Sequence, residues 1–207
     1  MIASRGANES VSRVLTIEKW LQERGAKATL NIGSGGTTWG SIRLDRQHTN
    51  RVTVRGDAAH LPFADSAFRG ATLTDVLEHL PAGSEKEVLR EIRRVLYPGG
   101  WLLITAPNKS RHMEWFDPAW WLLGHRHLSL TELEEMVESA GFSTEFVGST
   151  GTALREIPLV WMVYAVAFTN RMVGREVFHV PQTPADEISP DSRGYTAFLV
   201  ASKERGR

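Results

Sequence analysis

A glycine-rich turn follows an apolar strand near the start of the chain, and it constrains the fold more than any other feature. Residues 28–32 are apolar enough for a buried strand, which runs directly into Gly33-Ser34-Gly35-Gly36. Glycine lacks a Cβ atom, so the turn can bend sharply and let a ligand approach the main chain. Such turns are typical of nucleotide sites at the carboxyl ends of parallel strands. By itself the motif is equally compatible with a plain tight turn, so its meaning depends on the residues downstream of it.

The other predicted elements alternate between strands and helices. Apolar runs and helical periodicity predict strands at 28–32, 41–45, 52–54, 68–74, 101–106, 142–149 and 195–202, and helices at 12–24, 84–96 and from Ser129 or Thr131 to Gly141. This alternation predicts the α/β class, with a doubly wound, mostly parallel sheet of seven strands. Ser84 and Glu87 have the spacing of a capping box at the start of the second helix.

The connection between the first two strands is unusually short. Only about eight residues separate them, whereas a parallel crossover usually needs a dozen or more and contains a helix. Either these strands are not neighbours in a parallel sheet, or the crossover has lost its helix.

Composition narrows the functional classes. Lys plus Arg and Asp plus Glu both total 24, so the formal net charge is zero, which argues against a protein that mainly neutralises nucleic-acid phosphates. The chain has no cysteine, which excludes disulfides, a thiolate zinc site and a cysteine nucleophile. Residues 1–12 lack the apolar core of a signal peptide, and we expect a cytoplasmic protein.

We expect one domain over residues 1–207, with an aromatic lid loop at 109–128 and an apolar insert at 151–194. The apolar run 157–168 is too short to span a bilayer, which needs about 20 residues. We expect a helix there that is buried against the domain or against the partner of a homodimer. The alternative is peripheral contact with a membrane surface through 157–173.

Several motifs together resemble the class I S-adenosylmethionine-dependent methyltransferases. In chain order they are Asn-Ile-Gly-Ser-Gly-Gly at 31–36, Asp45, Gly-Asp-Ala at 56–58 with Leu-Pro-Phe at 61–63, Val-Leu-Glu-His-Leu at 76–80, Leu-Tyr-Pro-Gly-Gly at 96–100 and Ala-Gly-Phe at 140–142. The resemblance covers about residues 28–149 plus the terminal strand. It implies a Rossmann-like sheet whose last strand is antiparallel, with S-adenosylmethionine as the cofactor.

The resemblance also implies roles for individual residues. The turn would pass under the methionine and ribose, Asp45 would accept from both ribose hydroxyls, and Asp57 with Ala58 would contact adenine. Asp75 and Leu77 would face the methyl group. The alternative for Asp45 and Asp57 is turn formation, because Asp often ends strands. The expected cofactor-binding set is therefore Asn31, Gly33, Ser34, Gly35, Gly36, Asp45, Asp57, Ala58, Asp75 and Leu77.

Three departures from the family pattern bear on cofactor binding. Asn31 and Arg69 stand where the family usually has acids, and residues 37–40 replace the usual helix after the glycine turn. A branch of the family has a similarly shortened crossover, so we expect the fold to survive. The missing helix would otherwise present its amide end near the cofactor.

Two histidines are candidates for a general base, which a hydroxyl acceptor would require. His79 follows the fourth strand, and His127 follows the aromatic loop. The alternatives are helix capping or packing for His79, and a hydrogen bond that pins the loop for His127. Residues 124–127 lack the acidic or cysteine partners of a metal site. The aromatic residues could wall an apolar acceptor pocket or form a lid over the core; they are Trp115, Phe116, Trp120 and Trp121.

The sequence therefore predicts an enzyme that transfers a methyl group from S-adenosylmethionine to a small or medium-sized organic acceptor. One alternative is a non-catalytic protein that kept the fold and serves binding or interaction. The other is a membrane-associated methyltransferase acting on a quinone or lipid-linked acceptor.

Overall fold

In the computed structural model, the described residues are 11–24, 28–109, 113–173 and 187–205. They form one eight-stranded sheet with strand order β3-β2-β1-β4-β5-β8-β6-β7. The strands are β1 Thr29–Ile32, β2 Ile42–Asp45, β3 Val54–Arg55, β4 Phe68–Thr74, β5 Leu96–Pro107, β6 Phe142–Thr150, β7 Ile188–Ser189 and β8 Thr196–Lys203. Strands β1 to β5 pair in parallel, whereas β8 runs antiparallel to both β5 and β6.

The expected α/β fold with an antiparallel last strand is confirmed, but the count of seven strands is wrong. The additional strand, β7, pairs antiparallel with the end of β6, where Ile188 lies opposite Thr150. It has two residues and lies within the predicted insert. A strand this short contains no alternating pattern that the sequence could reveal.

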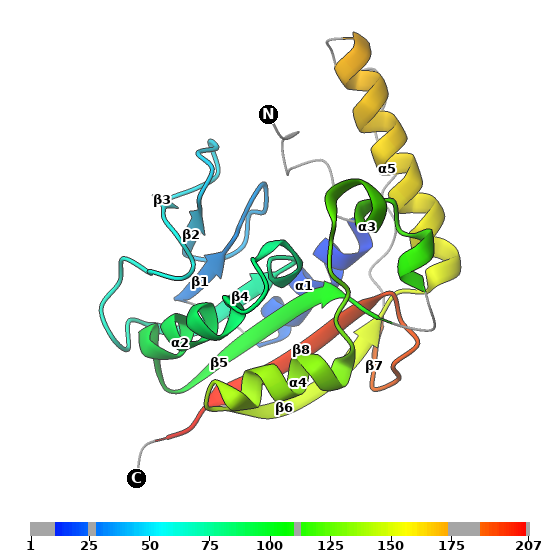
Figure 1. Cartoon of the computed structure of the whole chain (residues 1–207). Coiled ribbons are helices and arrows are strands. Elements are labelled where there is room, and N and C mark those ends of the chain that lie inside the picture. Colours follow the sequence, from blue (N-terminus) through cyan, green and yellow to red (C-terminus); the bar gives the residue numbers. More distant parts are fainter. Residues whose placement is uncertain (1–10, 25–27, 110–112, 174–186, 206–207) are drawn as a thin grey trace.

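Helices cover both faces of the sheet (Figure 1). Helix α1 (Val11–Glu23) lies behind it, and α2 (Glu85–Val95) and α4 (Leu130–Ser139) lie in front. Shorter segments and one long helix complete the described elements: η2 Leu77–His79, η3 Met113–Phe116, α3 Pro118–Leu123 and α5 Ala153–Val173. Because side chains alternate along a strand, β5 contributes to a separate hydrophobic cluster on each face.

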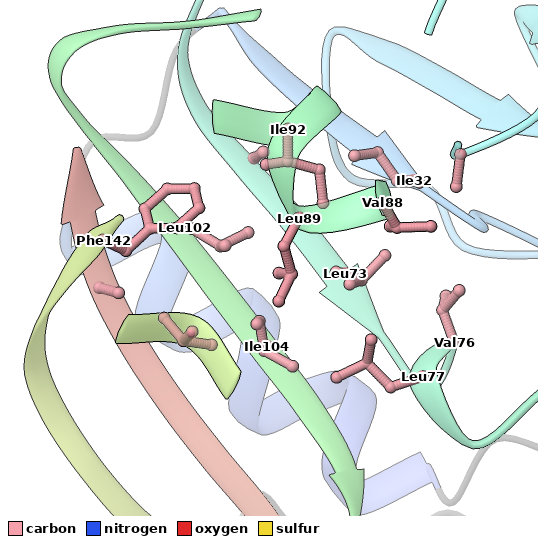
Figure 2. Close-up of a cluster of buried hydrophobic side chains, with 14 of the residues drawn as sticks. Ile32, Leu73, Val76, Leu77, Val88, Leu89, Ile92, Leu102, Ile104 and Phe142 are labelled. Carbon is pink, nitrogen blue, oxygen red and sulfur yellow. The ribbon is translucent and has the colours of Figure 1, made fainter. Parts of the chain in front are cut away.

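The larger cluster lies between the sheet and α2 with α4. Leu102 and Ile104 of β5 point to this side and contact buried residues such as Leu89 (Figure 2). Leu103 points to the other face, where it packs with Ile17 of α1. A sheet covered on both faces explains why residues 101–106 read as a continuous apolar run.

The short crossover joins neighbouring strands. Strands β1 and β2 pair in parallel, with Leu30 opposite Ile42, and no helix occurs in residues 33–41. Of the two alternatives for this connection, the crossover without a helix is confirmed.

Of the two helix N-caps expected from the sequence, the one at Ser129 forms and the one at Ser84 does not. At Ser129 the side chain accepts from the Glu132 backbone N–H, and the Glu132 carboxylate accepts from the Ser129 N–H, so a capping box forms. The capping box at Ser84 is wrong. Ser84 has helical dihedral angles instead of the extended ones of an N-cap, and its side chain accepts no hydrogen bond from the first turn; its hydroxyl donates to the Pro81 carbonyl at 2.7 Å.

Helix α5 confirms the expected helix but not its burial within the chain. It extends beyond the edge of the sheet in Figure 1. Trp161, Phe168 and Met172 are 52%, 66% and 72% exposed. Glu156 and Leu159 are buried, so the described residues cover part of the N-terminal half of the helix and leave these three side chains exposed. Residues 110–112 of the predicted lid loop and 174–186 of the predicted insert lie outside the described residues.

Candidate active site

The glycine turn is held between the end of β2 and the segment after β4. The backbone N–H groups of Gly33 and Ser34 both donate to the Leu44 carbonyl, at 2.8 and 3.1 Å. Gly33 has a φ of 68°, and a Cβ atom there would lie 2.3 Å from Cγ2 of Val76. Only glycine satisfies both the dihedral angle and the close contact.

Asp45 ties the turn to the end of β2. Its side chain is buried, and it accepts hydrogen bonds from the backbone N–H groups of Gly35 at 2.9 Å and Gln47 at 2.8 Å. A carboxylate has about four acceptor positions, so two remain after these bonds. The carboxylate therefore shapes the turn and keeps capacity to accept from a ligand.

Asp57 and Ala58 lie beside this arrangement. The Gly56 N–H donates to the Asp45 carbonyl at 3.0 Å, which joins the segment after β3 to the end of β2. Asp57 accepts from the Ala59 N–H at 3.0 Å, and its side chain is 47% exposed. Ala58 is buried. Gly35, Asp45 and Asp57 thus converge at the carboxyl edge of β1, β2 and β3, which is where open α/β sheets bind ligands.

The residues after β4 adopt an uncommon backbone conformation. Asp75 has a φ of 52°, a region that residues other than glycine rarely occupy, and such outliers cluster at functional sites. Its N–H donates to the Thr105 carbonyl at 3.0 Å, and the Thr105 hydroxyl donates to its carboxylate at 3.2 Å. Leu77 is fully buried and points into the core (Figure 2), so only its backbone can take part in binding.

Asn31 is fully buried beneath the turn. Its amide donates to the Thr37 hydroxyl at 2.7 Å and the Trp39 carbonyl at 3.3 Å, and it accepts from the Thr72 hydroxyl at 3.2 Å. The Thr37 hydroxyl in turn donates to the Ser34 carbonyl at 2.6 Å. Asn31 therefore holds residues 37–39 of the short crossover in place by hydrogen bonds. The crossover contains no helix that could do so.

The two candidate histidines occupy different environments. His79 is exposed, and its ring lies edge-on to that of His125 with the ring centroids 4.2 Å apart. The His127 side chain is only 2% exposed. Its Nε2 lies 2.9 Å from an Asp117 carboxylate oxygen, and its Nδ1 lies 3.3 Å from the Asn108 carbonyl. These contacts connect the end of the loop to Asn108 and Asp117, so His127 is placed to hold the loop in position.

Part of the loop that His127 pins is helical, since η3 and α3 lie in the expected lid at 109–128. Trp115, Trp120 and Trp121 contact one another, and the Trp121 indole N–H donates to the Trp115 carbonyl at 2.9 Å. Trp115, Phe116 and Trp121 are each more than half exposed, at 56%, 60% and 57%. They therefore do not form a covering of the core, and their role as walls of an acceptor pocket stays a prediction.

Sequence reasoning missed Arg126, which connects the lid loop to the segment after β4. Its guanidinium donates to the carbonyls of Leu77 and Leu80, at 2.9 and 3.1 Å, and forms an ion pair with the buried Glu85. Burial would raise the pKa of the Glu85 carboxyl, but hydrogen bonds from its own N–H, from Arg126 and from the Gly83 N–H hold it below its ordinary value. The sequence around Arg126 contains no pattern from which these three partners could be predicted.

The residues present fit a nucleoside with polar hydroxyl and amino groups. Ser34 is fully buried in the turn, and its hydroxyl has no hydrogen-bond partner among the described residues. Buried hydroxyls without a partner are uncommon and call for a ligand or water. The carboxylates of Asp45 and Asp57 supply hydrogen-bond acceptors for the hydroxyl and amino groups of such a nucleoside. Within the described parts of the chain, no cluster of three or more His, Cys, Asp or Glu residues could hold a metal ion.

The described residues have the fold of solved S-adenosylmethionine-dependent methyltransferases, with Asp45 at the end of β2 and Asp57 shortly after β3. Residues 30–104, about a third of the chain, match the family model described as "Methyltransferase domain". This match agrees with the resemblance seen in the sequence, and S-adenosylmethionine is the cofactor that the similarity implies.

Curated relatives match part of the chain. A "Probable S-adenosylmethionine-dependent methyltransferase" of Mycolicibacterium smegmatis is 34% identical over 96 residues, which cover 46% of this chain and 37% of the relative. A demethylmenaquinone methyltransferase of Corynebacterium kroppenstedtii is 43% identical over 65 residues, covering 31% of this chain and 27% of the relative. The chain therefore spans about a third of the length of the curated relatives that it matches.

Solved structures share the fold over most of the chain. A SAM-dependent methyltransferase from Thermotoga maritima superposes with a TM-score of 0.65 at 16% identity, covering 94% of this chain and 91% of that one. The likeness extends past residue 104 through the antiparallel end of the sheet. Within the described residues, no helix is long and apolar enough to cross a membrane.

Proposed function

We propose that this protein transfers a methyl group from S-adenosylmethionine to a small or medium-sized organic acceptor. The observation that carries the proposal is the convergence of Gly35, Asp45 and Asp57 at one edge of the sheet. Two carboxylates at this edge are acceptors that match the ribose hydroxyls and the adenine amino group as donors. The match of residues 30–104 to the methyltransferase family model and the buried Ser34 hydroxyl support the same assignment.

The bound cofactor supplies a methyl group on a sulfonium, which is an excellent leaving group. The acceptor atom forms a bond to the methyl carbon as the carbon–sulfur bond breaks, and the electron pair stays on sulfur. The protein therefore needs mainly to align the two partners and exclude water. Asp45 and Asp57 fix the nucleoside, and Asp75, in its left-handed conformation, borders the acceptor side of the site.

A hydroxyl acceptor must also lose a proton, and His79 is the better placed of the two candidate bases. It is exposed and follows β4, four residues after Asp75. His127 is engaged at both ring nitrogens, so we assign it to positioning of the loop that precedes α4. An acceptor that arrives without a proton to lose would require neither histidine.

Two alternatives are tested together with this proposal. A non-catalytic protein would bind cofactor without turnover, or fail to bind it. A quinone or lipid-linked acceptor is supported by the exposed Trp115 and Trp121 and by the similarity to a demethylmenaquinone methyltransferase. The single-domain organisation, the cytoplasmic location and a homodimer also remain proposals.

Calorimetric titration with S-adenosylmethionine and with S-adenosylhomocysteine tests the binding step. We expect both to bind, and we expect S-adenosylhomocysteine to accumulate when a panel of phenols, amines and quinones is supplied. Binding without turnover on every panel member favours the non-catalytic alternative, and turnover on quinones alone favours the lipid-linked one. Absence of binding at millimolar ligand contradicts the proposal.

A further inference from the structure

Large apolar side chains are exposed on one continuous surface formed by η3, α3 and α5. The Trp161 indole N–H on α5 donates to the carbonyl of Phe116 on η3, at 2.9 Å, which joins the two parts. The Trp cluster on η3 and α3 continues the surface. The members that are more than half exposed are Trp115, Phe116, Trp121, Trp161, Phe168 and Met172.

Among the α5 residues whose side chains the structure describes, the exposed ones follow a coiled-coil spacing. They are Pro158, Trp161, Ala165, Phe168 and Met172, with successive intervals of three, four, three and four residues. A 3-4 repeat averages 3.5 residues per turn and is the pattern of a helix that packs against a second helix. The stripe spans two heptads, which corresponds to about 21 Å of helix.

The size of the surface fits a protein interface. Aromatic side chains have about 150–250 Å² each, so six large residues that are slightly more than half exposed present on the order of 600 Å². A standard interface buries about 800 Å² per partner. Patches of this size on a monomer are usually functional.

A membrane surface fits the helix less well. Interfacial helices oppose their apolar face with a polar face rich in Lys and Arg. Residues 157–170 of α5 contain no charged residue, so this stretch has neither a basic face nor acids that would repel a partner helix. A narrow stripe with coiled-coil spacing is instead complementary to its own copy.

We propose that α5 is the centre of a homodimer interface, in which the stripe from Pro158 to Met172 packs against the same stripe of a second copy of this chain. The pairing is isologous, and the aromatic residues of η3 and α3 extend the interface on each side. This inference does not depend on methyl transfer, because it rests on the exposed apolar side chains of α5 and not on the glycine turn, Asp45 or Asp57.

Sedimentation of the full chain tests the interface. We expect twice the chain mass at micromolar concentrations, and we expect Phe168→Glu with Met172→Glu to raise the dissociation constant at least tenfold. The matched control is Tyr97→Glu, because Tyr97 is 49% exposed and lies on β5 outside the stripe; this variant should stay dimeric. A monomer in the wild type, or a dimer unchanged in the double variant, overturns the proposal.

A cross-link adds a test of register. Because the chain has no cysteine, a single Ala165→Cys variant can form a disulfide only with another copy. Ala165 lies midway along the stripe, so it faces its own copy in a centred pair, and oxidation should give covalent dimers. Exposed Ala64, replaced by Cys as the control, should not. Liposome flotation of a monomeric wild type that is lost in Phe168→Glu with Met172→Glu would assign the stripe to a membrane and overturn the homodimer.

Discussion

Replacement of Asp45 by Asn separates two roles of one carboxylate. The carboxylate accepts from the Gly35 and Gln47 N–H groups at 2.9 and 2.8 Å, and its side chain is buried. The carbonyl oxygen of Asn can replace only one of these oxygens, so its NH₂ group faces the other backbone N–H. One hydrogen bond to a charged group is lost, which costs about 1.5–3 kcal/mol.

The loss should appear both in stability and in binding. For a chain of this size, about 2 kcal/mol lowers the melting temperature by roughly 4–8 °C. The affinity for S-adenosylmethionine should fall at least tenfold, which corresponds to about 1.4 kcal/mol. Thermal denaturation gives the first quantity and calorimetric titration gives the second.

Asp57→Asn is the matched control. The Asp57 side chain is 47% exposed and accepts one backbone N–H, which an Asn oxygen can also accept. Its ion pair with Arg46 is exposed and contributes little. We expect weaker cofactor binding with a stability change below about 0.5 kcal/mol. An Asp45→Asn variant with unchanged melting temperature would refute the closure of the turn by Asp45, and unchanged affinity would refute its contact with ribose.

Three further changes probe the contacts around the site. Asp117→Ala leaves Nε2 of the buried His127 without its partner, so the free energy of unfolding should fall by about 1–3 kcal/mol, and proteolysis within 109–128 should accelerate; equal proteolysis rates would remove the pinning role. Arg126→Met removes the hydrogen bonds to both carbonyls and the ion pair with Glu85, so we expect a higher KM for the acceptor with cofactor affinity unchanged, and an unchanged KM counts against a positioning role. Hydrogen bonds from Arg94 hold the pKa of Glu91 below its ordinary value, so its contribution to stability is present above about pH 4.3 and is lost as the pH falls through the lowered pKa. Glu91→Gln should flatten acid denaturation in that range, and an identical pH profile would contradict the assignment.

Much of the fold could be predicted because its signals are local. The helix that begins at Ser129 or Thr131 and the apolar run of β5 each depend on residues within one element; both elements were confirmed, with Ser129 as the N-cap of the helix. The Ser84 capping box failed because Ser84 adopts helical dihedral angles instead of the extended ones of an N-cap, and the spacing of Ser84 and Glu87 does not reveal this. The two-residue strand β7 forms only because β6 offers it a partner.

The candidate site also has features that could be predicted from the sequence and features that could not. The positions of Gly35, Asp45 and Asp57 after successive strands were visible in the sequence, since parallel strands bring their carboxyl ends to one edge. The burial of His127 against Asp117 was not visible, because it depends on how η3 and α3 fold back onto the end of β5. The Arg126 contacts with Leu77 and Leu80 join segments nearly fifty residues apart.

By itself, the sequence determined the class of fold, the glycine turn and the acids at its edge, because backbone dihedral preferences and the alternation of apolar residues act over a few neighbouring positions. Tertiary structure alone decided which histidine stays exposed and that Arg126 links the lid loop to the site. It also decided that α5 presents a 3-4 stripe outward. These outcomes follow from burial and hydrogen bonds between distant segments, and such contacts exist only after the sheet has brought those segments together.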